Sequence, residues 1–406
     1  MNHRRQDRRT FIKRGSLGAF SAALGGMLFK RPLPAQEARP KIVYRKLGKT
    51  GLKIPIISFG VMNSDKHELI KKSLEKGVLH LDTAHGYLRG NSEKAIGTVL
   101  KEMGCRKKIT IATKVYLARD RETNVFLTEG SGFAPGATAE NFEKQLNLSL
   151  ERLQTDYVDI LYLHSLYSRE MATYEPMLAA LLKAKKDGKA RFIGVTTHAN
   201  EPEVIKAAVD TGVIEVIEVA YHYLQKNREE IKDAIKYAAE RGVGIVGMKT
   251  FGGSRLQQDA SIQLNHAAAL KWVLNDPNVT TVIPGMTNFD QLDFNFRIMQ
   301  DLTLTPEEEK ALSLAASLQG LLYCQNCRSC ASSCPQKVDI PQLMRAFMYA
   351  HGYENRYQAM DTVRRIPAGR GLDTCASCPT CTARCANGID IDRRIRSLSR
   401  TPYITA

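Results

Sequence analysis

The sequence predicts an α/β protein, a parallel (β/α)8 TIM barrel followed by a small helical module that is rich in cysteine. Between residues 42 and 295, eight short, β-branched apolar runs alternate with amphipathic stretches of helical period, as repeated βα units do. No Gly-x-Gly-x-x-Gly follows the first run, which argues against an open dinucleotide-binding sheet. Eight of the nine cysteines lie beyond residue 323, which marks a separate module.

The predicted strands are the eight apolar runs, at residues 54–60, 78–82, 109–114, 158–164, 192–196, 216–220, 243–248 and 281–284. The helical stretches that separate them include residues 67–76, 139–153, 177–186, 228–240 and 260–274. Gly77, Gly188, Gly212 and Gly242 stand where a glycine commonly ends a helix. In such a barrel the carboxyl ends of the strands meet at one face, so we expect the chemistry there.

Residues 1–38 are predicted to form an export signal. They have a basic start, a weakly apolar run at residues 15–29 and small residues after it. The apolar run is too short to span a membrane comfortably. Arg8 and Arg9 resemble the pair of a twin-arginine signal, although Asp7 stands where Ser or Thr is commoner. We therefore expect the twin-arginine export machinery to carry the folded protein to the periplasm or the cell exterior.

Cleavage after Ala35 or Ala38 fits the signal, and an uncleaved segment would remain as an anchor. The alternative is a basic amphipathic N-terminus that stays inside the cell. Residues 1–40 hold nine Lys or Arg against two Asp or Glu, and so contribute much of the formal charge of +16. No basic stripe with interleaved aromatic residues occurs elsewhere, and we expect no nucleic-acid partner.

Four polar residues stand at or just after the ends of successive predicted strands. Asp82 and Lys114 each end an apolar run, Tyr87 follows Asp82 by five residues in a turn, and His164 ends a third run. These residue types can form a proton-donating site. We expect Asp82 to hold Lys114, Lys114 to lower the pKa of Tyr87, and His164 to orient a carbonyl group.

This quartet resembles the catalytic tetrad of the aldo-keto reductases. The spacing of Asp82 and Tyr87, the pair Asp159-x4-His164 and the turn Gly90-Asn91-Ser92-Glu93 all match that family. The resemblance covers about residues 44–295 and implies a barrel that interconverts a carbonyl and an alcohol with a nicotinamide cofactor. It also implies that residues 44–53 form a hairpin that plugs the barrel bottom. The long loop at residues 117–136 would then help to select the substrate.

The resemblance also implies where a dinucleotide is held. Thr196, Thr197 and Glu218 take the places of the residues that hold the carboxamide. The expected pyrophosphate loop includes Lys249, Gly252, Gly253, Ser254 and Arg255, and the residues toward the adenosine end are Pro284, Gly285, Thr287, Gln291 and Asn295.

Three of these positions depart from the family pattern. Gly285 and Gln291 replace a Lys and an Arg that neutralise the 2′-phosphate in typical NADP-binding members, and Met248 stands where a stacking aromatic residue often lies. The choice between NADP and NAD therefore stays open.

Two cysteine runs share the spacing Cys-x2-Cys-x2-Cys-x3-Cys, the most specific pattern in the sequence. Three closely spaced thiolates can hold one iron–sulfur cluster while the fourth reaches a neighbouring cluster. Pro335 after the first run is usual for such proteins, whereas Ala386 after the second is not. The runs are Cys324, Cys327, Cys330 and Cys334, and then Cys375, Cys378, Cys381 and Cys385.

By resemblance to bacterial two-cluster ferredoxins, the fourth cysteine of each run is expected to serve the other cluster. One 4Fe-4S cluster would then take Cys324, Cys327, Cys330 and Cys385, and the other Cys375, Cys378, Cys381 and Cys334. Four disulfides are the alternative in an oxidising compartment, and zinc sites are a weaker one. The connector at residues 339–368 reads as helical, and its stripe of Met and Phe is expected to pack.

These features together predict an exported iron–sulfur oxidoreductase. Its expected domains are the signal at residues 1–38, the barrel at 40–303, a helical linker at 304–322 and the cluster module at 323–400. Two 4Fe-4S clusters would relay electrons between the barrel and a redox partner, either a protein or a quinone-linked donor. Clusters are assembled inside the cell, so export in the folded state agrees with their presence. The alternative is an electron-transfer protein whose barrel is a non-catalytic docking scaffold.

Overall fold

The computed structural model describes residues 42–117, 133, 137–252, 265–317, 324 and 326–404. The predicted export signal, most of the loop at residues 117–136, and Gly253, Ser254 and Arg255 lie outside these ranges. None of the described helices is long and apolar enough to cross a membrane.

Eight parallel strands, paired in chain order, form the barrel that the sequence predicts. Ile57 pairs with Val282 and Gly60 with Gly285, and these parallel bridges join the first and last strands. The Ser58 N–H donates to the Val282 carbonyl at 2.8 Å across the same seam. The strands are β3 Phe59–Gly60, β4 His80–Asp82, β5 Thr110–Val115, β6 Val158–Leu166, β7 Ala190–Thr197, β8 Val216–Ala220, β9 Gly244–Met248 and β10 Thr281–Val282.

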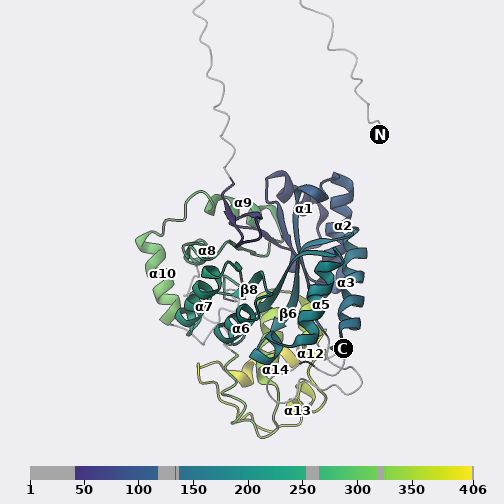
Figure 1. Cartoon of the computed structure of the whole chain (residues 1–406). Helices are drawn as coiled ribbons and strands as arrows, with labels where there is room; N and C mark the ends of the chain where they lie inside the picture. The colour runs from purple at the N-terminus through teal and green to yellow at the C-terminus, as the bar shows by residue number, and fades with distance from the viewer. Residues whose placement is uncertain are drawn as a thin grey trace, which may run out of the picture. The chain divides into compact units, whose positions relative to one another are not determined.

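Helices surround the strands on the outside of the barrel (Figure 1). Each buries one apolar stripe, as Phe142, Leu146, Leu150 and Leu153 do on α3. Gly77 and Gly242 follow α1 and α7 with φ values of 94° and 82°, as glycines that end helices should. The main helices are α1 His67–Glu75, α2 Asn91–Met103, α3 Ala139–Leu153, α5 Glu175–Lys186, α6 Glu201–Asp210, α7 Arg228–Glu240, α8 His266–Leu274 and α9 Phe289–Ile298.

A hairpin of β1 Tyr44–Lys46 and β2 Lys53–Pro55 lies at the end of the barrel where the strands begin. Leu47, between the two strands, is fully buried in the barrel interior together with Ile160 and Val216. Gly48 has a φ of 48°, and a Cβ there would lie 2.4 Å from the Gly242 carbonyl. The hairpin therefore closes this end, and the opposite end of the barrel remains for the site.

The predicted linker contains one helix, α10 Pro306–Ser317, which packs on the barrel. Leu312 and Ala315 of α10 contact an apolar cluster that includes residues of α8. Lys271 of α8 forms an ion pair of 2.9 Å with Glu308. The described part of the linker therefore belongs to the barrel surface.

The cysteine module is helical, as predicted. Its helices are α11 Ile340–Phe347, α12 Arg356–Arg364, α13 Leu372–Ala376 and α14 Ile391–Ser399, and a π-helical turn, Met348–Gly352, continues α11. Leu343 and Met344 of α11 are buried against a core that includes Ile395 and Leu398 of α14. The apolar stripe of the connector therefore packs, as expected.

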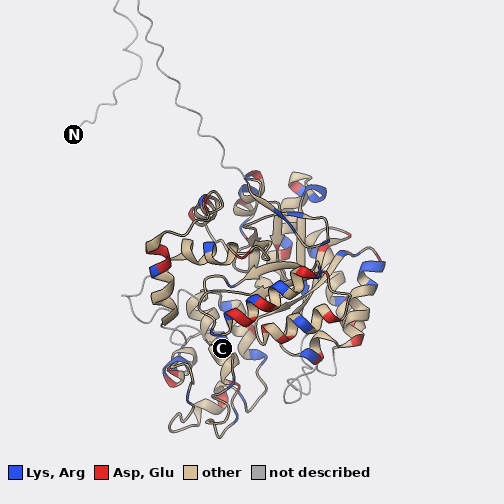
Figure 2. Ribbon diagram, turned by 60° about the vertical axis from the view of Figure 1, so that its left-hand side comes forward, with Lys and Arg blue, Asp and Glu red and all other residues tan. Residues whose placement is uncertain are grey.

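On the helices outside the barrel, acidic and basic residues are interspersed (Figure 2).

Candidate active site

A cavity of about 280 Å³ opens at the carboxyl ends of the barrel strands. Its barrel side includes Asp82, Tyr87, His164 and Glu218. Its other side comes from the cysteine module, which the sequence did not place here. The module contributes Asn326, Arg328, Arg345, Tyr349, Gln358 and Arg365.

Direct contacts join the module to the barrel around this cavity. The Asn355 Nδ2 donates to Asn63 Oδ1 at 2.7 Å, and Asn63 ends the 3-10 turn that follows the first barrel strand. The guanidinium of Arg365 lies 4.3 Å from the ring centroid of Tyr116, a cation–π contact. The cavity is therefore built by both modules.

Lys114 lies at the base of the cavity between two carboxylates. Its Nζ forms a short contact with Asp82 and donates to the Thr83 carbonyl at 3.0 Å. The same Nζ lies 3.1 Å from Glu218 Oε2. The side chains of Lys114, Asp82 and Glu218 are all at least 98% buried. One cation is thus shared by two buried acids.

Tyr87 enters the cavity from a tight turn after β4. Leu88 and Arg89 follow it with φ values of 49° and 56°, a left-handed conformation that costs energy in residues other than glycine. The Lys114 Nζ lies 5.5 Å from the Tyr87 ring centroid. Lys114 acts to lower the pKa of Tyr87, as expected, but burial has the larger effect and the pKa is raised. The phenol therefore keeps its proton, as a proton donor must.

His164 is turned into the cavity by an irregularity at the end of β6. The pairing register with β7 shifts between Leu163 and Leu166, and Ser165 has a φ of 70°. The His164 ring meets the Tyr87 ring edge-on, with centroids 6.0 Å apart. Burial and then Lys114 hold the pKa of His164 well below its ordinary value. The imidazole is therefore neutral and can hydrogen-bond a carbonyl oxygen without adding charge.

Most of the described residues expected to hold a dinucleotide line this same cavity. They are Glu218, Lys249, Pro284, Gly285, Thr287, Gln291 and Asn295. A Cβ at Gly285 would meet nothing closer than 3.8 Å, so there is open space beside it. The backbone N–H of Thr287 donates to Gln291 Oε1 at 2.7 Å and fixes that side chain. The residues present fit an extended dinucleotide.

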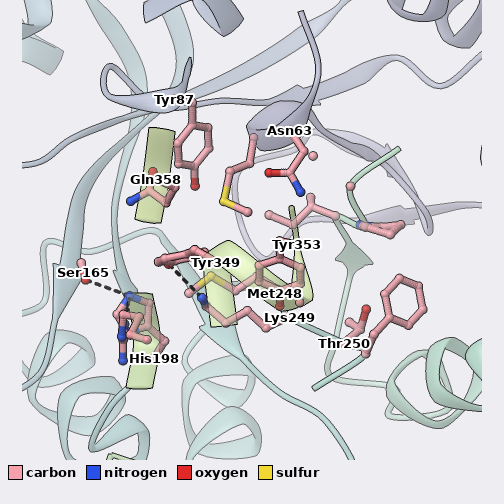
Figure 3. Close-up of a pocket in the computed structure, with 18 of the residues that line it drawn as sticks. Asn63, Tyr87, Ser165, His198, Met248, Lys249, Thr250, Tyr349, Tyr353 and Gln358 are labelled. Atoms are coloured by element: carbon pink, nitrogen blue, oxygen red, sulfur yellow. Dashed lines mark hydrogen bonds between the residues drawn. The ribbon is translucent and has the colours of Figure 1, made fainter. Parts of the chain in front are cut away.

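Thr196 and Thr197 do not line the cavity. The Thr196 hydroxyl accepts from the Ser165 N–H at 2.7 Å, and the Thr197 hydroxyl donates to the Ala199 carbonyl at 2.9 Å. Ser165 and His198 line the cavity nearby, and their side chains are 2.9 Å apart (Figure 3). The two threonines therefore shape the ends of β6 and β7.

Gly252, an expected dinucleotide residue, and Lys66, which was not expected, lie beside residues that line the cavity. Gly252 has a φ of 55°, and a Cβ there would lie 2.8 Å from Leu224, so this position favours glycine. Lys66, which no sequence pattern indicated, donates to the Thr287 carbonyl at 2.8 Å. Lys66 does not line the cavity, but it places a cation beside Thr287, which does, and Gly285 and Gln291 provide no charge there.

The first set of thiols combines three cysteines of the first run with the last cysteine of the second. Burial raises the pKa of Cys330 to about 12, and Cys324, Cys385 and Cys327 each add to the rise. Asn387 bridges two members of the set. Its backbone N–H donates to Cys385 Sγ at 3.3 Å, and its Nδ2 lies 3.7 Å from Cys327 Sγ.

The second set of thiols lines a separate cavity of about 180 Å³. It consists of Cys334, Cys375, Cys378 and Cys381. Burial and the other three thiols raise the pKa of Cys375 to about 11. The two sets thus have the grouping expected from two-cluster ferredoxins, and four thiols around a cavity suit a 4Fe-4S cluster.

All nine cysteines are free, so the disulfide alternative finds no support. Among the described residues, no three His, Cys, Asp or Glu side chains are arranged to hold a single metal ion. Four thiolates around one zinc ion would each lie about 2.3 Å from it. The described thiols are therefore not arranged around a single ion such as zinc.

The loop of the first thiol set borders the cavity that contains Tyr87 and His164. Asn326 and Arg328, which alternate with its cysteines in the sequence, line that cavity. Arg345 Nη1 lies 2.6 Å from His198 Nδ1 of the barrel. Burial raises the pKa of Cys324, and the charge of Arg345 acts against this rise. Sequence reasoning missed Arg345 because the face by which the module docks is set by long-range packing.

Comparisons with known proteins cover both modules. Residues 57–266 match the family model described as "Aldo/keto reductase family", and residues 323–389 match that described as "4Fe-4S dicluster domain". The chain is 28% identical to the L-galactose dehydrogenase of Arabidopsis thaliana, over 67% of this chain and 93% of that protein. It is 24% identical to the L-glyceraldehyde 3-phosphate reductase of Escherichia coli O157:H7, over 67% and 92%.

Among solved structures, the aldo-keto reductase AKR11C1 from Bacillus halodurans in its holo form superposes with a TM-score of 0.55. The two chains are 25% identical, and the match covers 68% of this chain and 96% of the other.

Proposed function

Because this chain belongs to the aldo/keto reductase family, we propose that it interconverts a carbonyl and an alcohol with a nicotinamide cofactor, and that two 4Fe-4S clusters relay electrons to or from this site. One observation carries the proposal. The loop that holds three cysteines of the first set lines the same cavity as Tyr87 and His164.

The barrel residues supply the proton chemistry. Tyr87, whose pKa is raised, donates its proton to the carbonyl oxygen as an alcohol forms, and takes it back in the reverse direction. The phenolate that remains lies near the Lys114 ammonium, which stabilises it. The neutral His164 hydrogen-bonds the same oxygen and orients it. Asp82 and Glu218 hold Lys114 in place.

The residues for the dinucleotide lie beside this machinery. Glu218 and Ser165 would meet the nicotinamide end, Lys249 the pyrophosphate, and Thr287 and Gln291 the adenosine end. A bound nicotinamide supplies or accepts a hydride at the substrate carbon. Among the described residues, Lys66 is a cation close to the expected adenosine end, and this supports NADP as a candidate beside NAD.

The arrangement of the thiol sets supports the relay. A 4Fe-4S cluster passes electrons singly, so two clusters match the two electrons of a hydride. The first set borders the catalytic cavity and the second lines a separate cavity. We propose that the second faces a redox partner, either a protein or a quinone-linked donor.

Two of the relatives are named for small hydroxylated carbonyl compounds, L-galactose and L-glyceraldehyde 3-phosphate. We propose a small carbonyl or alcohol as the substrate here.

We also propose that residues 1–38 direct export of the folded, cofactor-loaded protein by the twin-arginine route. A double variant with Arg8→Lys and Arg9→Lys should then stay inside the cell. Export of this variant at the normal level would contradict the twin-arginine route.

Anaerobic purification with analysis of iron, sulfide and extracted nucleotide tests the proposed function. We expect about eight irons per chain and bound NAD(H) or NADP(H). Iron without nucleotide, combined with failure to bind added nucleotide, would favour the alternative in which the barrel is a docking scaffold.

A further inference from the structure

A second tyrosine–lysine pair lies in the catalytic cavity, and it joins the two modules. Tyr349 belongs to the π-helical turn of the cysteine module, and Lys249 follows β9 of the barrel. The Lys249 Nζ donates to the Tyr349 hydroxyl at 3.3 Å and lies 5.2 Å from its ring centroid. Both residues line the cavity into which Tyr87 points (Figure 3).

This pair repeats the arrangement of Tyr87 and Lys114, where the ammonium lies 5.5 Å from the ring centroid. The surrounding charges differ, however. The Lys114 ammonium lies between the carboxyl groups of Asp82 and Glu218, whereas no described carboxylate forms an ion pair with Lys249. Tyr349 is only 6% exposed, so its side chain is surrounded by other protein groups and by the cavity that it lines.

The groups that face Tyr349 are mainly cationic. Lys249 comes from the barrel, Arg345 from α11 and Arg365 from the end of α12, and all three lower its pKa. They outweigh burial, and the pKa of Tyr349 lies below its ordinary value. Tyr87 has its pKa raised in the same cavity, to a small extent by Tyr349 itself. Two groups whose pKa values are pushed apart suit the roles of acid and base.

We propose that Tyr349 is a catalytic base that removes a proton from the carbon next to a substrate carbonyl, while Tyr87 protonates the carbonyl oxygen. The site would thereby enolise carbonyl compounds that carry such a hydrogen. This activity goes beyond hydride transfer and uses residues of both modules.

The step is balanced without an oxidant or a reductant. The phenolate of Tyr349 takes the proton of the C–H bond, and the electron pair of that bond becomes the C=C bond of the enol. The π pair of the carbonyl moves to oxygen, which takes the proton of Tyr87. Tyr349 ends as a phenol beside Lys249, and Tyr87 as a phenolate beside Lys114. Reversal in heavy water places deuterium on the carbon.

Solvent exchange tests this step with the full, cluster-loaded chain and no added nucleotide. Hydroxyacetone in buffered D2O is the probe, and loss of its C–H signals in proton NMR is the readout. We expect the wild type to exchange above buffer and Tyr349→Phe to exchange about 10²–10⁴-fold more slowly. Wild-type exchange no faster than buffer, or an unchanged rate in Tyr349→Phe, would overturn the proposal.

A spectroscopic titration separates a base from a structural residue. The pH-difference spectrum of the wild type should contain a tyrosinate that ionises before the others, and Tyr349→Phe should lack it. Lys249→Met should move it to higher pH, because a nearby cation is lost. Tyr357→Phe is the matched control, since its phenol accepts from Arg356 at 2.8 Å outside the cavity. Persistence of the early tyrosinate in Tyr349→Phe would overturn the proposal.

The inference rests on the shared cavity and Tyr87 of the proposed function, but not on the nucleotide. Failure to bind NAD(H) or NADP(H) would defeat the proposed function and leave exchange intact. Loss of exchange with normal nucleotide binding would defeat only the enolisation.

Discussion

The Lys114 ammonium lies 3.1 Å from Glu218 while it also contacts Asp82, so one buried cation faces two buried carboxylates. Two carboxylates that share a site cannot both ionise freely. Burial and Asp82 raise the pKa of Glu218 well above 4.5, although Lys114 opposes this. Glu218 therefore keeps a proton at pH values where an exposed glutamate has lost it.

This proton makes stability depend on pH. In the unfolded chain Glu218 loses its proton near pH 4.5, whereas in the folded protein it keeps the proton to higher pH. Its contribution to stability is therefore full below about pH 4.5 and falls as pH rises, by about 1.4 kcal/mol per pH unit at most. Glu218→Gln lacks the titrating group and so should not lose this stability. The thermal midpoint of Glu218→Gln minus that of the wild type should therefore increase from pH 5 to pH 8.

Far-UV circular dichroism of the cluster-loaded proteins measures these midpoints. Glu203→Gln is the control, because Glu203 is exposed on α6 and should leave the pH dependence unchanged. A constant difference between wild type and Glu218→Gln across the range would show that Glu218 is ionised throughout.

The phenol of Tyr87 is the predicted proton donor. Tyr87→Phe should lower turnover of a carbonyl substrate by about 10²–10⁴-fold, the usual contribution of general acid catalysis. Nucleotide binding and iron content should persist, because the ring and its contact with His164 remain. Steady-state kinetics and a nucleotide titration provide the test, and normal turnover would rule out this role.

Much of the barrel could be predicted because its signals are local. The helix at residues 228–240 has the predicted bounds, since an apolar stripe runs through it and Gly242 follows it. The strand ends that carry Asp82, Lys114 and His164 meet at one face because parallel strands in a barrel must. The resemblance of the two cysteine runs to two-cluster ferredoxins likewise indicated which thiols gather.

The module side of the cavity could not be predicted, because docking depends on contacts far apart in the sequence. Asn355 meets Asn63 across 292 residues. Tyr349 lies in the connector, for which the sequence predicted only a packed stripe of Met and Phe and did not single out this tyrosine. The pairing of Glu218 with Lys114 is also tertiary, since the family resemblance assigned Glu218 to the carboxamide. Thr196 and Thr197 were also expected to hold the carboxamide, but they do not line the cavity, because their hydroxyls hydrogen-bond backbone groups at the strand ends.

The grouping of thiols across the two runs predicts shared phenotypes. Cys385→Ala and Cys327→Ala should each lose the cluster beside the catalytic cavity and leave about four irons. Their remaining electron paramagnetic resonance spectra should be the same. Cys334→Ala and Cys378→Ala should leave the other spectrum. If Cys385→Ala instead resembled Cys378→Ala, each run would bind its own cluster.

An arginine lies near each thiol set. Arg345 acts on Cys324 of the first set, whereas Arg396 lines the cavity of the second set and interacts with Cys381. A positive charge favours the reduced, more negative state of a cluster, so its loss lowers the reduction potential. Arg345→Leu should therefore lower the potential of the cluster beside the catalytic cavity by an amount on the order of tens of mV.

Arg396→Leu is the matched variant, and it should lower the potential of the other cluster alone. Its shift should be the smaller, because Asp392 lies 2.7 Å from Arg396 and already offsets part of its charge. A redox titration followed by electron paramagnetic resonance resolves the two clusters. Equal shifts of both potentials in Arg345→Leu would mean that Arg345 is not specific to the first set, and the relay would lose its charged link to the catalytic cavity.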